Sequence, residues 1–202
     1  MSKGEQTRQR ILQQAAPLLN QRGFQGCSMS DIMEATGLEK GGIYRHFANK
    51  EELAGEAFRY ALEQAVKNRT DGLEHLSGAL EKLRFLIHRF VETPSPIAGG
   101  CPLLNTAVDA DDGNAALRKL VRHAFADWRK RLADIVAEGI ETGEIRNDAS
   151  ATGVANTIIG ALEGALVLSR LEGNREPLRD AEASLTSLLE LIANRQTQAL
   201  GA

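Results

Sequence analysis

The side chains best suited to chemistry in this chain gather between Ser28 and Lys50. This stretch combines long cations with hydroxyl, phenol and imidazole groups: Ser28, Ser30, Lys40, Tyr44, Arg45, His46 and Lys50. Such groups are the ones that bind the phosphate oxygens and base edges of DNA. The composition of the stretch therefore predicts contact with DNA rather than catalysis.

Short helices are expected to position these groups. Ser28 followed by Asp31 resembles a capping box, in which a hydroxyl accepts from a backbone amide at the start of a helix. Gly37 is predicted to end this helix, because glycine tolerates the left-handed conformation found there. A second helix over residues 40–46 follows. Asn49 with Glu52 repeats the capping pattern and predicts a third helix.

The second short helix has an inner and an outer face. Ile43 and Phe47 are four residues apart, so they share one face and are expected to point inward. Lys40, Tyr44 and Arg45 can then point outward. Two short helices joined by a glycine turn form a helix-turn-helix, whose second helix enters the major groove. The alternative is an ordinary helical hairpin with a solvated basic face.

The order of several short motifs resembles the TetR/AcrR family of bacterial transcriptional regulators. The motifs are T-R-x-x-I-L, R-G-F, S-x-x-D-I, G-L-x-K-G-x-I-Y-x-H-F and N-K-E-x-L. In this chain they comprise Thr7, Arg8, Ile11, Leu12, Arg22, Gly23, Phe24, Ser28, Asp31, Ile32, Gly37, Leu38, Lys40, Gly41, Ile43, Tyr44, His46, Phe47, Asn49, Lys50, Glu51 and Leu53. The resemblance covers roughly the first quarter of the chain. Two residues depart from it: Glu39 replaces a frequent Ser cap, and Pro17 within the first helix predicts a kink.

The resemblance and the chemistry together suggest roles in DNA binding. Lys40 and Arg45 are expected to reach guanine edges or phosphates, and Tyr44 matches a family tyrosine that donates to a phosphate. The remaining candidates are Gly41 and Gly42, whose backbone can approach the duplex, Lys50, which can share a phosphate with a helix N-terminus, and Ser28, Ser30 and His46. Ser28 could instead be occupied as a cap, and His46 could be packed inside.

Charge is distributed unevenly along the chain. The 202 residues carry a net charge of −3. Residues 1–50 contain seven Lys/Arg and four Asp/Glu, a balance of +3, so residues 51–202 carry −6. A basic head on an acidic body suits a protein that touches DNA with one end. We therefore assign residues 1–50 to a DNA-binding domain and residues 51–202 to an effector-binding and dimerisation domain.

The rest of the chain is predicted to be helical. Further helices are expected over residues 51–69, 73–92, 101–108, 114–142, 150–171 and 175–195, with breaks at 93–100 and 109–114. The fold class is therefore all-α, with about nine helices and no strand. We expect no hydrophobic run long enough to span a bilayer and no basic and apolar leader, and therefore a soluble, cytoplasmic protein.

The last two helices each have a strongly apolar side. Ile158, Leu162, Ala165 and Leu166 mark the first, and Leu185, Leu188, Leu189 and Ile192 mark the second. A purely internal core would explain much of this pattern. The resemblance implies instead that the two helices pair with their copies in a homodimer, as helix-turn-helix proteins bind paired half-sites.

The effector site is less well defined. Cys101 follows two glycines, and the resemblance suggests a reactive thiol, whose pKa a helix start would lower. The alternative is a small cysteine that is simply packed in the core. Phe125 and Trp128 are the other candidates for an effector pocket. We expect a small-molecule or thiol-reactive effector of unidentified structure.

Several classes of protein are disfavoured. The two cysteines form no disulfide framework, no His/Cys cluster has zinc-ligand spacing, and no phosphate-binding loop is present. We therefore expect no cofactor, no metal and no enzyme, but a repressor that binds a double-stranded DNA operator. The alternatives are an activator or effector-independent regulator, an enzyme with Cys101 as nucleophile and His88 or His123 as partner, and a helical protein-binding module.

Overall fold

Every regular element in the described part of the chain is helical. The computed structural model describes residues 2–110 and 113–194. Within these residues it contains nine α-helices, which confirms the all-α class: α1 (Lys3–Gly26), α2 (Met29–Thr36), α3 (Lys40–Tyr44), α4 (Lys50–Thr70), α5 (Ala79–Glu92), α6 (Pro102–Ala110), α7 (Ala115–Glu141), α8 (Ala151–Glu172) and α9 (Glu176–Ile192). A short 3₁₀ turn covers Leu73–His75.

The helices form two compact units. The first comprises Met1–Asn68 and Ser95–Phe125, and the second comprises Arg69–Pro94 and Ala126–Ala202. Helices α4 and α7 each contribute residues to both units. The predicted functional boundary at residue 50 stays a prediction, because compactness does not reveal which residues bind DNA.

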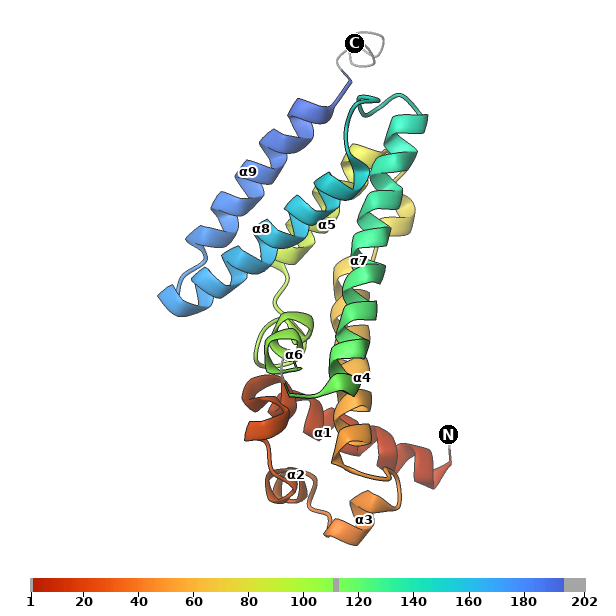
Figure 1. The fold of residues 1–202 in the computed structure, drawn as a ribbon, viewed down its shortest axis with the longest axis vertical. Coiled ribbons are helices and arrows are strands. Elements are labelled where there is room, and N and C mark those ends of the chain that lie inside the picture. The colour runs from red at the N-terminus through yellow and green to blue at the C-terminus, as the bar shows by residue number, and fades with distance from the viewer. Residues whose placement is uncertain (1, 111–112, 195–202) are drawn as a thin grey trace. The chain divides into compact units, whose positions relative to one another are not determined.

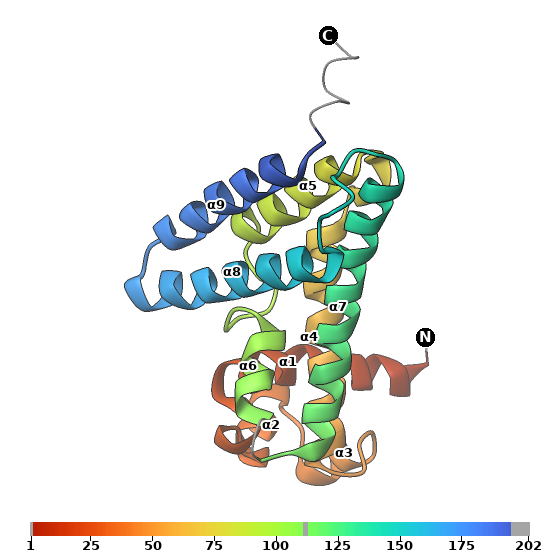
Figure 2. The ribbon, with the colours of Figure 1, turned by 45° about the horizontal axis from the view of Figure 1, so that its top comes forward.

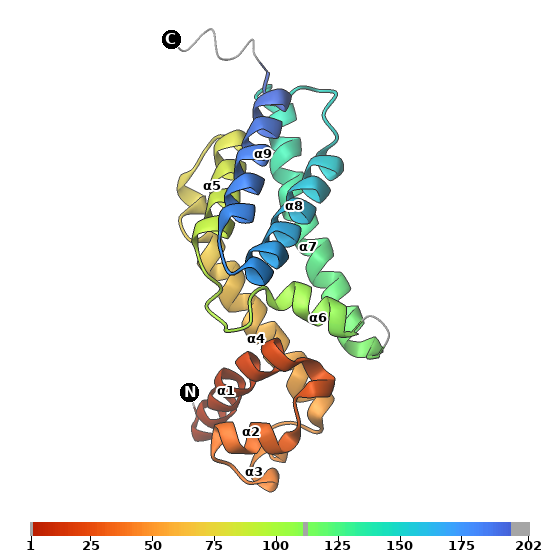
Figure 3. The ribbon, with the colours of Figure 1, turned by 90° about the vertical axis from the view of Figure 1, so that its left-hand side faces the viewer.

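The core of the first unit holds the short helices against α1 and α4. Its fully buried large side chains include Ile11 of α1, Ile32 of α2, Ile43 of α3 and Leu53 of α4. Figure 3 shows α2 and α3 side by side next to α1 and α4. Because α2 and α3 are too short to be stable alone, burial against the two long helices is what keeps them folded.

Helix α1 departs from helical geometry at Gly23 and not at Pro17. Pro17 lies within the helix, whereas Gly23 has φ 73° and ψ 173°. The kink that Pro17 predicts is therefore found six residues later. Glycine adopts this conformation readily because it has no Cβ.

The second unit is built around α5, α8 and α9. Helices α8 and α9 are joined by a short turn and run back along one another, and both pack on α5 (Figures 1 and 2). Leu83, Ile87, Ile158, Leu162, Leu185 and Leu189 are among the buried residues between them. The apolar stripes predicted on α8 and α9 thus lie mainly in the core of this unit.

Helix α5 begins later than the sequence predicts, at Ala79 rather than at Leu73. Glu144 explains the start, because its carboxylate accepts the amides of Ala79 at 2.6 Å and Leu80 at 3.0 Å. This cap comes from a residue far along the chain, so local sequence patterns could not reveal it. Helix α9 ends at Ile192, and the predicted last residue, Arg195, lies outside the described residues.

The expectation that no segment is long and apolar enough to span a bilayer is wrong for helix α8. Its 22 residues are long and apolar enough to cross a bilayer by length and composition, and one third of its most apolar window is buried. The helix therefore keeps an apolar surface outside the core. Val167, Leu168 and Leu171 are exposed on α8, and Leu171 is 79% exposed.

Candidate DNA-binding interface

The predicted capping box at the start of α2 is present. The Asp31 amide donates to Ser28 Oγ at 3.1 Å, and the Ser28 amide donates to Asp31 Oδ2 at 2.7 Å. Arg22, at the end of α1, pairs with Asp31 Oδ1 at 2.7 Å. The hydrogen bonds from the Ser28 hydroxyl and amide, together with Arg22, hold the pKa of Asp31 below its ordinary value.

Helix α3 presents two distinct faces, as predicted. Ile43 is 0% exposed and Phe47 is 2% exposed. Lys40 and Arg45 are exposed, and Tyr44 is half-buried. The Lys40 ammonium lies 5.9 Å from the centre of the Tyr44 ring, so these two groups form one polar patch. The helix is shorter than the predicted 40–46, and Glu39 provides no side-chain cap.

The outer surface of α3 also contains backbone without side chains. Gly41 is exposed, and a Cβ placed there would meet nothing within 4 Å. A Cβ at Gly42 would meet Leu38 Cβ at 3.6 Å, which is an ordinary contact. The fold therefore does not require glycine at position 41 for lack of space.

Lys50 is engaged within the protein. Its ammonium donates to the carbonyl oxygen of Phe24 and lies 4.3 Å from the centre of the Phe24 ring. The ring carries negative charge on its faces, so the contact is attractive. An ammonium has three donors, so this one hydrogen bond leaves the others available to a phosphate.

The two serines occupy different environments. The hydroxyl of Ser28 donates to Asp31 Oδ2 at 2.6 Å in addition to accepting the Asp31 amide. Its hydrogen-bonding capacity is therefore largely used by the cap. Ser30 is exposed on the first turn of α2, whereas His46 is half-buried.

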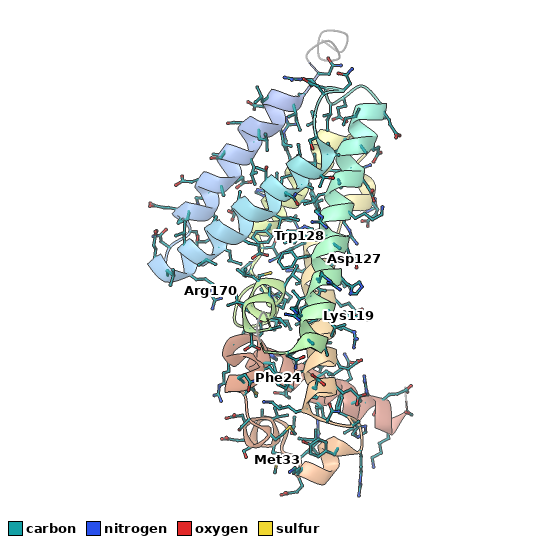
Figure 4. The ribbon with its side chains drawn as sticks, in the orientation of Figure 1. Phe24, Met33, Lys119, Asp127, Trp128 and Arg170 are labelled. Carbon is teal, nitrogen blue, oxygen red and sulfur yellow. The ribbon has the colours of Figure 1, made fainter. Side chains whose placement is uncertain are left out.

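The three predicted effector residues fall in different units. Cys101 and Phe125 belong to the first unit, and Trp128 belongs to the second. Cys101 is 2% exposed and lies just before α6. Trp128, labelled in Figure 4, stacks on Phe90 with ring centres 5.9 Å apart. Cys27 is completely buried, and desolvation raises its thiol pKa, as expected for a structural cysteine.

Two observations bear on metal binding and on the alternative of a Cys101 nucleophile. The described residues contain no group of three or more His, Cys, Asp or Glu side chains arranged to hold a metal. The two histidines considered as partners for a Cys101 nucleophile each contact another group through Nδ1. His88 Nδ1 lies 2.9 Å from Glu182, and His123 Nδ1 lies 2.7 Å from the carbonyl of Lys119.

Three contacts were not predicted from the sequence. Arg22 pairs with Asp31, and Asp109 and Asn105 of α6 bind the backbone near the end of α1. The four-residue spacing of Asn105 and Asp109 was the available signal, since it puts both on one face of a helix. The prediction of a break at residues 109–114 concealed it.

Comparison with known proteins decides the family. A family model described as "Bacterial regulatory proteins, tetR family" matches residues 11–57, and one described as "Tetracyclin repressor-like, C-terminal domain" matches residues 79–185. The chain belongs to the TetR family. The first TetR model covers the helix-turn-helix, and the second lies beyond it.

Individual relatives support the same family across nearly the whole chain. A TetR transcriptional regulator from Chloroflexus aurantiacus is 42% identical with a TM-score of 0.90, over 96% of this chain and 98% of that one. One from Cytophaga hutchinsonii is 36% identical with a TM-score of 0.89, over 96% and 98%. The transcriptional repressor DhaR of a Mycobacterium species is 28% identical over 85% of this chain and 86% of its own. The protein is thus a DNA-binding TetR-family transcriptional regulator.

Proposed function

We propose that the protein is a homodimeric repressor that leaves its operator when a small molecule binds in residues 51–202. The observation that carries the proposal is the separation of α3 into an inner and an outer face. The buried Ile43 and Phe47 fix the helix, and the outer face offers Lys40, Tyr44 and Arg45 to the major groove. DNA lies in the cytoplasm of bacteria, where we expect the protein to act.

The DNA contacts divide into base readers and phosphate binders. Arg45 and Lys40 are the side chains that can reach base edges, because both are long, exposed cations. Lys40 is the first residue of α3, and Arg45 directly follows its last residue. Tyr44, Lys50, Ser30 and His46 are assigned to phosphates, and Gly41 and Gly42 to close approach of the backbone. The occupied hydroxyl of Ser28 favours the cap as its main role.

The dimer is assigned to the outer faces of α8 and α9. Leu168 and Leu171 of α8 and Leu191 of α9 are exposed apolar side chains. Gly160 and Gly164 are also exposed, and a Cβ at either would meet nothing within 4 Å. A second copy is a better cover than lipid, because Asn156 and Thr157 on the same helix are exposed polar side chains.

A small molecule is preferred to a thiol reagent as the effector. A sensor cysteine must expose its thiolate, whereas Cys101 is 2% exposed. Modification of Cys101 by a maleimide with loss of operator binding would instead favour the thiol. Phe125 and Trp128 remain candidates for the pocket. Activation and effector-independent regulation are the alternatives, since the position of the operator decides the sign of regulation.

Selection of bound fragments from a random DNA pool tests the proposal directly. We expect enrichment of a sequence with two-fold symmetry, because a dimer presents two recognition helices. Tyr44→Phe and Lys50→Ala should then weaken binding to all fragments, and Arg45→Ala should relax preference at particular bases by about 1–3 kcal/mol. Recovery of no sequence, or of an asymmetric one, would contradict the dimeric repressor.

The release mechanism has its own test. An effector must favour a conformation in which the two copies of α3 no longer match the spacing of the half-sites. Spin labels at Tyr44 in each copy should therefore change their separation when the effector is added. An unchanged separation together with release of DNA would contradict the mechanism.

A further inference from the structure

The end of α1 contains a break in its own hydrogen bonding, and two side chains of α6 fill it. In an uninterrupted helix the amide of Phe24 would donate to the carbonyl of Asn20. At the Gly23 kink these groups find other partners. The Phe24 amide donates to Asp109 Oδ2 at 2.6 Å, and the Asn20 carbonyl accepts Asn105 Nδ2 at 3.0 Å.

The fit between α6 and the break is close. A Cβ at Gly23 would lie 2.5 Å from Asp109 Oδ1, so glycine is needed there for space as well as for its conformation. The side chain of Asn20 is buried and donates to the carbonyl of Ala98 at 2.9 Å, which ties down the segment before α6. Asn105 and Asp109 thus bind backbone groups that the Gly23 kink leaves accessible to them.

The break is also connected to the first residue of α4. Phe24, labelled in Figure 4, uses its amide for Asp109 and its carbonyl for the Lys50 ammonium. The same ammonium lies over the Phe24 ring. The position of Phe24 therefore determines where the Lys50 ammonium rests.

The broken helix has a second possible arrangement. If α6 withdrew, the free Phe24 amide and Asn20 carbonyl could pair with each other in a straight helix. Both arrangements satisfy the backbone groups, as buried amides and carbonyls require. An element with two discrete arrangements can transmit a change from one site to another.

We propose that Asn105 and Asp109 are positioning residues for DNA binding, which hold the break in α1 and so place the Lys50 ammonium for a phosphate. The proposal rests on the proposed function, in which Lys50 contacts DNA. It adds a connection from α6 through α1 to the helix-turn-helix.

Operator affinity of α6 variants tests this role. Asp109→Ala removes the acceptor and is expected to weaken binding about tenfold, the usual scale for a lost hydrogen bond to a charged group. Asp109→Asn keeps an acceptor and should remain within about threefold of the wild type. Val108→Ala, on the same helix at a side chain that is 73% exposed, is the matched control and should bind normally. Equal affinities of wild type and Asp109→Ala would overturn the proposal.

A double-mutant cycle separates positioning from general destabilisation. If Asp109 acts through Phe24 on the ammonium, Asp109→Ala should have no further effect on operator affinity in a Lys50→Met background. A merely structural Asp109 would instead give the same loss in both backgrounds, and that result would overturn the proposal. Each operator affinity is calculated from the concentration of folded protein, so that loss of folded protein is not counted as loss of binding.

Exchange of the Phe24 amide provides a readout without DNA. Measured by NMR, this amide should exchange at least about tenfold faster in Asp109→Ala than in the wild type, while amides in α8 keep their rates. An unchanged exchange rate would show that Asp109 of α6 does not hold the Phe24 amide of α1, and would overturn the proposal. A wild type that binds no operator would contradict the proposed function. The exchange rate would still show whether Asp109 protects the Phe24 amide.

Discussion

At the scale of single residues, the interface depends on side chains that hold the backbone as much as on those that face DNA. Asp31 accepts the Ser28 amide, the Ser28 hydroxyl and the Arg22 guanidinium. One carboxylate therefore joins the end of α1 to the start of α2. The charged form of Asp31 is the form that makes these contacts.

The Asp31 contacts predict a dependence of stability on pH. A carboxylate whose pKa is lower in the folded than in the unfolded state adds stability above its unfolded pKa, near 3.9, and loses it as pH falls through the folded value. Asp31→Asn should therefore have a lower Tm than wild type at pH 7. The two Tm values should converge as the pH falls below about 4. A gap that persists at low pH would contradict this role for the charge.

Gly41 provides a test in which stability and binding change in opposite directions. Gly41→Ala fills open space on α3, so it should raise the free energy of unfolding by roughly 0.5–1 kcal/mol. The same methyl group would stand between α3 and the duplex and should weaken operator binding. Urea denaturation and a binding titration measure the two effects. Tighter or unchanged binding would mean that DNA does not approach Gly41.

At the scale of elements, the direction of α1 depends on Gly23 and on Asp109 of α6, which contacts the backbone there. Pro17 remains within helical geometry, whereas Gly23 takes a conformation that other residues rarely adopt. The Asp109 carboxylate occupies the space where a side chain at Gly23 would extend. The helix therefore bends where another helix can use the exposed backbone.

Gly23→Ala should accordingly be costly. Strain in the backbone and the clash with Asp109 are expected to lower the free energy of unfolding by roughly 1–3 kcal/mol, measured by urea denaturation. Gly4→Ala in the first turn of the same helix is the control, since the nearest atom to the added Cβ would be Ser2 Oγ at 3.9 Å. Equal stability of Gly23→Ala and wild type would show that α1 can straighten freely.

At the scale of the whole molecule, the proposed activity needs two copies. A single helix-turn-helix reads one half-site, and the exposed apolar surface of α8 and α9 offers a place for the second copy. The net charge of −6 outside residues 1–50 should keep the rest of the molecule away from DNA.

A charge placed in the proposed dimer surface should separate the copies. Leu168 is 51% exposed, so Leu168→Glu is tolerable in the monomer but would bury a carboxylate in a dimer. We expect a monomer by analytical ultracentrifugation and a loss of operator binding. Val108→Glu, a similar change at an exposed apolar residue of α6, should leave the dimer intact. A dimeric Leu168→Glu would place the interface elsewhere.

Binding to the operator should also weaken steeply with salt. Each phosphate neutralised by a cation adds about −0.9 to the slope of log K against log salt concentration. Lys50→Ala should make this slope less steep by about one unit for each copy, whereas a residue that contacts only bases should leave it nearly unchanged. An unaltered slope in Lys50→Ala would remove Lys50 from the phosphate contacts.

The sequence by itself determined the all-α class, the glycine turn after α2 and the inward face of α3. These follow from local rules: Gly37 closes a helix, Ser28 with Asp31 opens one, and the spacing of Ile43 and Phe47 fixes a face. The order of the motifs was enough to indicate the TetR family, because many residue types at fixed positions match the family together.

The tertiary structure decided where distant groups meet. Glu144 sets the start of α5, and Asp109 and Lys50 converge on Phe24. It also showed that the apolar stripe of α8 is used in the core while another apolar surface stays outside. Periodicity shows that a helix has an apolar side but not what covers it, and contacts between residues far apart in the chain leave no local signal.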